Sequence, residues 1–154
     1  MITHFLYDYR ILLSGLIAWW MAQALKVPTG FLLHRRWNWA LAFSAGGMPS
    51  SHSSLVTATT FAIGLFSGFN TPAFAISFAM SMVVVYDAAG IRRQAGIHAQ
   101  RLNILISEFF SGQPISEEQL KEVLGHTPRQ VFAGVLLGLL IPLLYLWAFQ
   151  GYRG

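Results

Sequence analysis

The chain has 154 residues, of which 55% are hydrophobic and only 10% are charged. Because soluble domains carry about 25% charged residues, this composition predicts one integral-membrane domain over residues 1–154 and excludes an ordinary soluble protein. The lack of cysteine excludes disulfides and thiolate metal sites. We assign the net charge of +4 to membrane topology, and we expect no nucleic-acid partner.

Apolar segments recur along the chain and predict an all-α fold, a polytopic membrane bundle of about four segments with added amphipathic helices. A spanning helix needs about 20 residues, and only the last segment is comfortably that long. The middle two segments are joined by a turn signal at residues 68–72. They form either a short spanning hairpin, which we favour, or a re-entrant hairpin. The segments cover about residues 11–25, 55–69, 72–86 and 131–149.

Basic residues predict the orientation of these segments. Eight of the ten Lys and Arg side chains lie between the first and second segments, at 26–36, or between the third and fourth, at 92–129. Positive charge concentrates in cytoplasmic loops, so both long loops should be cytoplasmic and both termini should face outward. The retained first segment and the compact chain fit a bacterial plasma membrane.

The long loop from residue 88 to residue 129 carries two amphipathic helix signals. One is a run of apolar residues at helical spacing, and the other is a capping box at residues 116–119 that starts a helix ending at Gly125. We expect both helices on or near the cytoplasmic surface, and we favour packing under the bundle over a role in substrate binding. The apolar run is Leu102, Leu105, Ile106 and Phe109.

Two pairs of glycines have the four-residue spacing that allows close helix approach. They are Gly64 with Gly68, and Gly134 with Gly138. Such pairs can mediate packing within the chain or dimerisation, and a homodimer is plausible because so small a domain has few helices with which to enclose a site.

The stretch from Gly46 to Ser54 holds four serines and a histidine directly before the second apolar segment. Either Ser50 or Ser51 can cap that helix, which places His52 in its first turn. Helix N-termini present free N–H groups and a partial positive charge, so they bind phosphate readily. Crowded hydroxyls beside one imidazole therefore predict a phosphate site.

A second histidine, His126, directly precedes the last apolar segment. Thr127 is a good N-cap residue, Pro128 suits the first helical position, and Gln130 completes a capping box. Two histidines near a phosphate site suit phosphoryl transfer, because one imidazole can attack phosphorus while the other protonates the leaving oxygen. Imidazole titrates near neutrality and so serves either role.

Cationic side chains near these histidines can hold the phosphoryl oxygens. Lys26 ends the first apolar segment, while Arg92 and Arg93 follow the third. The two arginines also serve as a topology signal. Asp87 lies at a membrane boundary, where a carboxylate is costly unless it is paired, and one of these arginines is its simplest partner.

Three blocks, at residues 46–53, 86–96 and 124–128, resemble the divergent PAP2 family. That family is also called the acid phosphatase/vanadium-dependent haloperoxidase-related family. The resemblance covers nearly the whole chain and includes Gln23 and Lys26. It implies that His52 is the general acid, that His126 is the nucleophile which becomes phosphohistidine, and that no metal or other cofactor is required.

The chain departs from the better-known PAP2 phosphatases at four places. Ser51 replaces the glycine of the middle block, and Leu33 occupies the arginine position seven residues after Lys26. Residues 119–120 stand where the last-block arginine would be, and Gln130 replaces the carboxylate four residues after the nucleophile. Arg92 or Arg93 must then clamp the phosphate, and Asp87 must orient His126. The candidate catalytic residues are His126, His52 and Asp87; the candidate phosphate ligands are Lys26, Ser50, Ser51, Ser53, Arg92 and Arg93.

Three functions are compatible with these residues. The leading one is a membrane phosphatase that hydrolyses a lipid phosphate or diphosphate at the cytoplasmic leaflet, such as phosphatidylglycerol phosphate, phosphatidate or a prenyl diphosphate. The second is a non-catalytic membrane protein that binds phospholipid headgroups or scaffolds partners. The third, a vanadate-using haloperoxidase, is less favourable because a small membrane site suits a lipid better than peroxide and halide.

Overall fold

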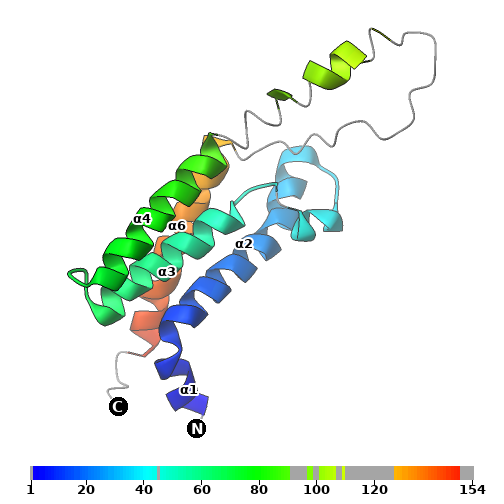
Figure 1. Cartoon of the computed structure of the whole chain (residues 1–154). Coiled ribbons are helices and arrows are strands. Elements are labelled where there is room, and N and C mark those ends of the chain that lie inside the picture. Colours follow the sequence, from blue (N-terminus) through cyan, green and yellow to red (C-terminus); the bar gives the residue numbers. More distant parts are fainter. Residues whose placement is uncertain are drawn as a thin grey trace.

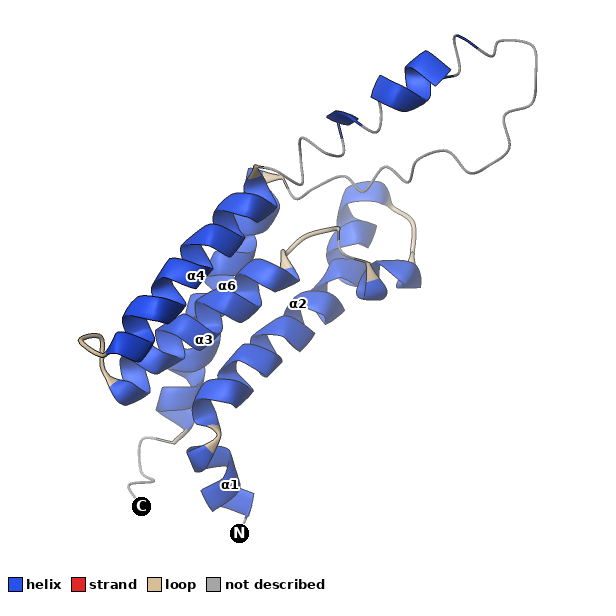
Figure 2. Cartoon of the chain, viewed as in Figure 1, coloured by secondary structure: helices blue, strands red, loops and turns tan. Residues whose placement is uncertain are grey.

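The computed structural model describes residues 2–44, 46–90, 97–98, 101–106, 109 and 127–149. Every regular element in this part of the chain is a helix, so the predicted all-α membrane fold is confirmed (Figures 1 and 2). The elements are α1 (Ile2–Asp8), α2 (Arg10–His34), the 3₁₀ helix η1 (Trp39–Phe43), α3 (Ser51–Ser67), α4 (Pro72–Ala89) and α6 (Pro128–Ala148).

Helix α3 is the centre of the bundle and contacts α2, α4 and α6 (Figure 1). Its buried positions carry only small or hydroxyl side chains, which let three neighbouring helices approach it closely. The small core around Ala18, Ala58 and Ile141 reflects this packing. The buried residues of α3 are Ser51, Ser53, Ser54, Ala58, Thr60, Ala62 and Gly64.

Three of the helices are long and apolar enough to cross a membrane: α2 over Arg10–Leu33, α4 and α6. Helix α3 has 17 residues and is shorter than these three. At 1.5 Å per residue it is about 25 Å long, close to a hydrocarbon core of about 30 Å. In Figure 1, α3 and α4 run alongside α6 for most of its length. This arrangement favours the spanning hairpin over the re-entrant one.

The first apolar segment is longer than the sequence indicated. Helix α2 continues through Pro28 and ends at His34, where the C-cap residue Arg35 adopts a left-handed φ of 57°. The expectation that Lys26 ends this segment is therefore wrong, because Lys26 lies inside the helix. Proline is tolerated in membrane helices where hydroxyl side chains support the backbone, and Thr29 Oγ1 lies 2.7 Å from the carbonyl of Leu25.

Helices α3 and α6 meet through the second glycine pair. A Cβ atom added to Gly134 would lie 2.5 Å from the Ser50 carbonyl oxygen, and one added to Gly138 would lie 2.8 Å from that of Ser54. No side chain fits at either distance, so this pair packs within the chain. Gly64 instead lies against the ring of Phe69, which an added Cβ would overlap.

The predicted starts of α3, α4 and α6 are confirmed. Ser50 caps α3 by accepting a hydrogen bond from the Ser53 amide, which resolves the choice between Ser50 and Ser51. Thr71 caps α4 directly before Pro72, at the predicted turn. Thr127 begins α6 with a capping box that includes Gln130. These caps are local features, which is why the sequence revealed them.

Residues 101–106 are helical, as the apolar spacing predicted. Their apolar side chains are exposed, and Phe109 is exposed as well. Asn103 in the same segment is buried, and packing of this segment under the bundle stays a prediction. An exposed apolar face fits a helix that lies on a membrane surface. The helix predicted from the capping box at residues 116–119 lies outside the described residues.

Candidate functional site

One end of the bundle collects the candidate residues that the structure describes. The C-terminal ends of α2 and α4 lie there with the N-terminal ends of α3 and α6 (Figure 1). The Ser50 amide donates a hydrogen bond of 2.9 Å to the Gln130 carbonyl, which joins the starts of α3 and α6. Antiparallel packing thus brings four distant parts of the sequence to the same end.

Lys26 is buried at this end, with a side chain only 1% exposed. Its Nζ donates to the Ser44 carbonyl at 2.6 Å and lies 3.4 Å from Ser51 Oγ. Within the described ranges no carboxylate pairs with this ammonium group. A buried charge is costly unless it is compensated, so Lys26 beside the start of α3 forms a site that favours an anion.

The loop between η1 and α3 covers the aliphatic part of Lys26. Gly47 has a φ of +91°, which favours glycine, and an added Cβ would lie 3.5 Å from Lys26 Cγ. Thr29 Oγ1 contacts the Met48 carbonyl and ties the loop to α2. The sequence indicated the glycines as turn residues, but nothing in their pattern showed that the loop wraps this lysine.

The serines at the start of α3 divide between two surfaces. Ser51 faces Lys26, whereas Ser53 Oγ donates to Ser50 Oγ at 3.0 Å. Ser54 Oγ lies 2.9 Å from the Ser50 carbonyl and 3.0 Å from the Gly134 carbonyl, on the side of α6. The spacing i, i+3, i+4 puts Ser50, Ser53 and Ser54 on one helix face, and this signal could have separated them from Ser51.

His52 and Asp87 line the same cavity. This cavity has a volume of about 220 Å³ and lies between the first turn of α3 and the last turns of α4. Its other lining residues are Val83, Val84 and Ala88. The structure therefore places the predicted general acid near the predicted carboxylate, which come from positions 35 residues apart in the sequence. We name this space the polar-end cavity.

The other candidates lie outside the described residues, namely Arg92, Arg93 and His126. Thr127, the neighbour of His126, begins α6, and its amide donates to Gln130 Oε1 at 3.0 Å. That oxygen of Gln130 thus serves the helix cap. Helices α4 and α6 contact each other, and the three candidates adjoin these two helices in the sequence.

Taken together, the described residues supply a buried cation, the N–H groups of a helix start, an imidazole and a carboxylate. A cation and a helix N-terminus both favour a phosphate group. An imidazole can transfer a proton to or from an oxygen of a bound phosphate ester, and a carboxylate can orient an imidazole. This set suits phosphate binding and general acid–base chemistry.

Comparison with known proteins agrees with a helical membrane protein. The chain is 38% identical over 150 residues to the uncharacterized membrane protein YuiD of Bacillus subtilis (strain 168), covering 90% of this chain and 95% of that protein. No solved structure matches the chain significantly. The profile of the divergent PAP2 family matches residues 7–141, which include Lys26, His52 and Asp87. The chain is an integral membrane protein and belongs to the divergent PAP2 family.

Proposed function

We propose that this protein is a membrane phosphatase that hydrolyses a lipid phosphate or diphosphate. The observation that carries the proposal is the buried Lys26, which lies 3.4 Å from Ser51 at the start of α3 without a carboxylate partner in the described ranges. A phosphoryl group bound there would compensate the lysine charge. Family membership supports a phosphatase-related activity.

The proposed reaction proceeds in two steps. An imidazole nitrogen of His126 attacks phosphorus and forms a P–N bond as the P–O bond to the lipid breaks. His52 donates its proton to the leaving oxygen, and Asp87 orients the imidazole of His126. Water then attacks the phosphohistidine, the P–N bond breaks and inorganic phosphate leaves, while His52 accepts the proton from water.

Several cations would stabilise the charge of the phosphoryl group. Lys26 contacts the oxygens from within α2, and Arg92 or Arg93 clamps them from the chain that follows α4. Ser51 faces Lys26 and can donate a hydrogen bond to the same oxygens. Ser50 and Ser53 contribute indirectly by stabilising the start of α3, because their hydroxyls bond to each other.

The site faces the cytoplasm of a bacterial plasma membrane in this proposal. Basic residues concentrate at the same end as the candidate site, and positive charge marks the cytoplasmic side. Lipids made at the inner leaflet are then the expected substrates. They include phosphatidylglycerol phosphate, phosphatidate and a prenyl diphosphate, which would place the protein in phospholipid or prenyl metabolism.

A second candidate function is headgroup binding without catalysis. The specific observation in its favour is the bond from the Thr127 amide to Gln130 Oε1. A capping glutamine is a weaker partner for an imidazolium at position 126 than the carboxylate that it replaces. In this case the site would hold a phospholipid headgroup or a partner protein.

Phosphate release from purified wild-type protein tests the choice between these functions. We expect inorganic phosphate, detected with malachite green, from at least one of phosphatidylglycerol phosphate, phosphatidate and farnesyl diphosphate in detergent micelles. Mass spectrometry after rapid base quenching should find phosphohistidine at His126. Binding of these lipids without release and without phosphohistidine would favour the non-catalytic function instead.

Replacing Lys26 by methionine tests the anion site directly. We expect Lys26→Met to lower phosphate release by about 10²–10³-fold, the usual loss when one charge-stabilising group is removed. The matched control is Arg36→Met, which removes an exposed cation from the same end and should leave release near the wild-type level. Equal losses in both variants would indicate a general effect of charge and contradict a specific role for Lys26.

A further inference from the structure

A second cavity continues from the polar-end cavity along the seam between α3 and α4. It has a volume of about 370 Å³. Its lining begins on α3 one turn after His52 and on α4 one turn before Val84, so the two cavities lie end to end. We name the pair the α3–α4 groove. The lining of the second cavity is Leu55, Val56, Thr59, Thr60, Ser77, Met80 and Ser81.

Three of the four hydroxyl groups of the second cavity, those of Thr60, Ser77 and Ser81, are bonded to the protein, and Thr59 carries the fourth. Thr60 Oγ1 and Ser81 Oγ lie 2.7 Å apart, and Ser81 Oγ also donates to the Val56 carbonyl at 2.9 Å. Ser77 Oγ donates to the Phe74 carbonyl at 3.1 Å. Polar groups that already have partners offer a ligand only their hydrocarbon faces, so this part of the groove is suited to an apolar chain.

The groove is open on the outer side of the bundle. Met80 is 60% exposed and Val83 is 65% exposed, and both belong to α4, a helix of which little is buried. In a spanning helix these side chains face lipid. A lipid chain can therefore enter the groove sideways from the bilayer, without passing through the protein.

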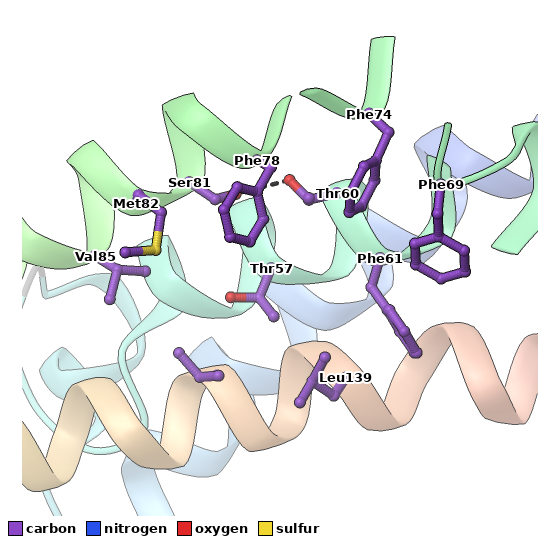
Figure 3. A pocket seen from close by; sticks show the side chains of 11 residues that line it. Thr57, Thr60, Phe61, Phe69, Phe74, Phe78, Ser81, Met82, Val85 and Leu139 are labelled. Atoms are coloured by element: carbon purple, nitrogen blue, oxygen red, sulfur yellow. Dashed lines mark hydrogen bonds between the residues drawn. The ribbon is translucent and has the colours of Figure 1, made fainter. Parts of the chain in front are cut away.

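A cavity on the other side of the same seam provides a contrast. It has a volume of about 330 Å³, faces α6 and is lined mainly by apolar side chains, including Phe61, Phe74 and Phe78 (Figure 3). Thr60 and Ser81, which are joined by a hydrogen bond (Figure 3), line both this cavity and the groove. Its lining contains no titratable side chain. Of the cavities in the described part of the chain, the groove is the one whose lining includes His52 and Asp87 next to an apolar part.

We propose that the α3–α4 groove holds one hydrocarbon chain of a lipid phosphate whose phosphate binds at the start of α3, next to the polar-end cavity. This inference rests on the proposed phosphatase function and assigns the binding place of the substrate's hydrocarbon chain. From His52 to Thr60 the groove runs about 12 Å along α3 at 1.5 Å per residue. A second chain, where the lipid has one, remains in the bilayer.

The groove determines the position of the bound lipid and contributes little to the affinity for it. Lipid tails in a bilayer are as apolar as the groove, so moving a chain into it gains little hydrophobic energy. Affinity comes from the phosphate at the polar end, and the bound chain fixes the direction of the ester bond relative to His52. Near-attack geometry of this kind accelerates reactions.

Two methionines of α4 provide a matched test. Met80 lines the groove and Met82 lines the cavity that faces α6, and their exposed fractions are 60% and 57%. The probe is phosphatidate with a diazirine partway along one acyl chain, in phosphatidylcholine nanodiscs. After irradiation of the wild type, we expect mass spectrometry to find the label on α3 and α4 residues of the groove.

Met80→Trp should reduce this groove labelling by about tenfold, the order expected when a bulky ring overfills a site. In Met82→Trp the groove labelling should equal that of the wild type. Ser77→Leu is a second groove-filling variant, because its hydroxyl bonds only within its own helix. Tryptophan fluorescence melting confirms that each variant is folded before labelling.

The two proposals fail separately in this experiment. Equal labelling of the wild type and Met80→Trp would contradict chain binding in the groove, even if the wild-type protein releases phosphate. Label concentrated in the cavity facing α6 would contradict it as well. A different result would support chain binding in the groove and contradict the phosphatase proposal. In that result, Met80→Trp and Ser77→Leu both remove the groove labelling, and no lipid releases phosphate.

Discussion

Alanine at His52 is expected to lower phosphate release from a lipid phosphate by about 10²–10⁴-fold, the usual contribution of a general acid. His52 lies in the first turn of α3 and lines the polar-end cavity with Asp87. In the proposed mechanism its proton neutralises the alkoxide that leaves phosphorus. Without that proton the P–O bond must break to give an unstable anion.

The leaving group distinguishes this role from a merely structural one. p-Nitrophenolate is stable without protonation, so in single-turnover experiments His52→Ala should release p-nitrophenolate from p-nitrophenyl phosphate almost as fast as the wild type does, although the later hydrolysis of phosphohistidine is slowed. The matched control is His98→Ala, which removes an exposed imidazole and should leave both activities near the wild-type level. Equal loss in the single-turnover step with both substrates would show that His52 does not act as the general acid.

Replacing Gly138 by leucine is expected to lower the melting temperature by about 3–10 °C, from the usual cost of overpacking and the temperature dependence of stability. An added Cβ would lie 2.8 Å from the Ser54 carbonyl oxygen and 2.7 Å from Thr57 Cβ. Both atoms belong to α3, so the leucine must push α3 and α6 apart. Tryptophan fluorescence in detergent reports the melting, because the chain has five tryptophans.

A leucine elsewhere on the same helix provides the control. Ala148 is exposed near the end of α6, and Ala148→Leu should melt as the wild type does. Size-exclusion chromatography separates packing within the chain from packing between chains. If Gly138→Leu changed the oligomeric state without lowering the melting temperature, the glycine pair would serve a dimer rather than the contact between α3 and α6.

Local features of the fold were predictable from the sequence. Ser50, Thr71 and Thr127 begin helices because a cap depends on residues within one turn. The end of the first segment was predicted wrongly, since Lys26 and Pro28 are poor residues for an isolated membrane helix. Packing against neighbouring helices and the Thr29 hydroxyl stabilise the longer helix, and neither contribution is visible in a local pattern.

The candidate site was predictable as a set of residues and not as an arrangement. Ser51 and His52 could be chosen from their chemistry and their position at a helix start, and Lys26 could be chosen from its chemistry. Burial of Lys26 under the loop at Gly47 depends on how α2 meets α3. The shared cavity of His52 and Asp87 depends on how α3 meets α4, and sequence spacing carries no record of that contact.

By itself, the sequence determined that this protein is a helical membrane protein with its positive charge near one end of the helices. Composition, hydropathy and capping act over a few residues, so they can be read directly. The tertiary structure decided which glycines pack within the chain, which serine faces Lys26 and which side of α4 extends the polar-end cavity. These features depend on which faces of separate helices meet, because close packing admits only the combination whose side chains fit together.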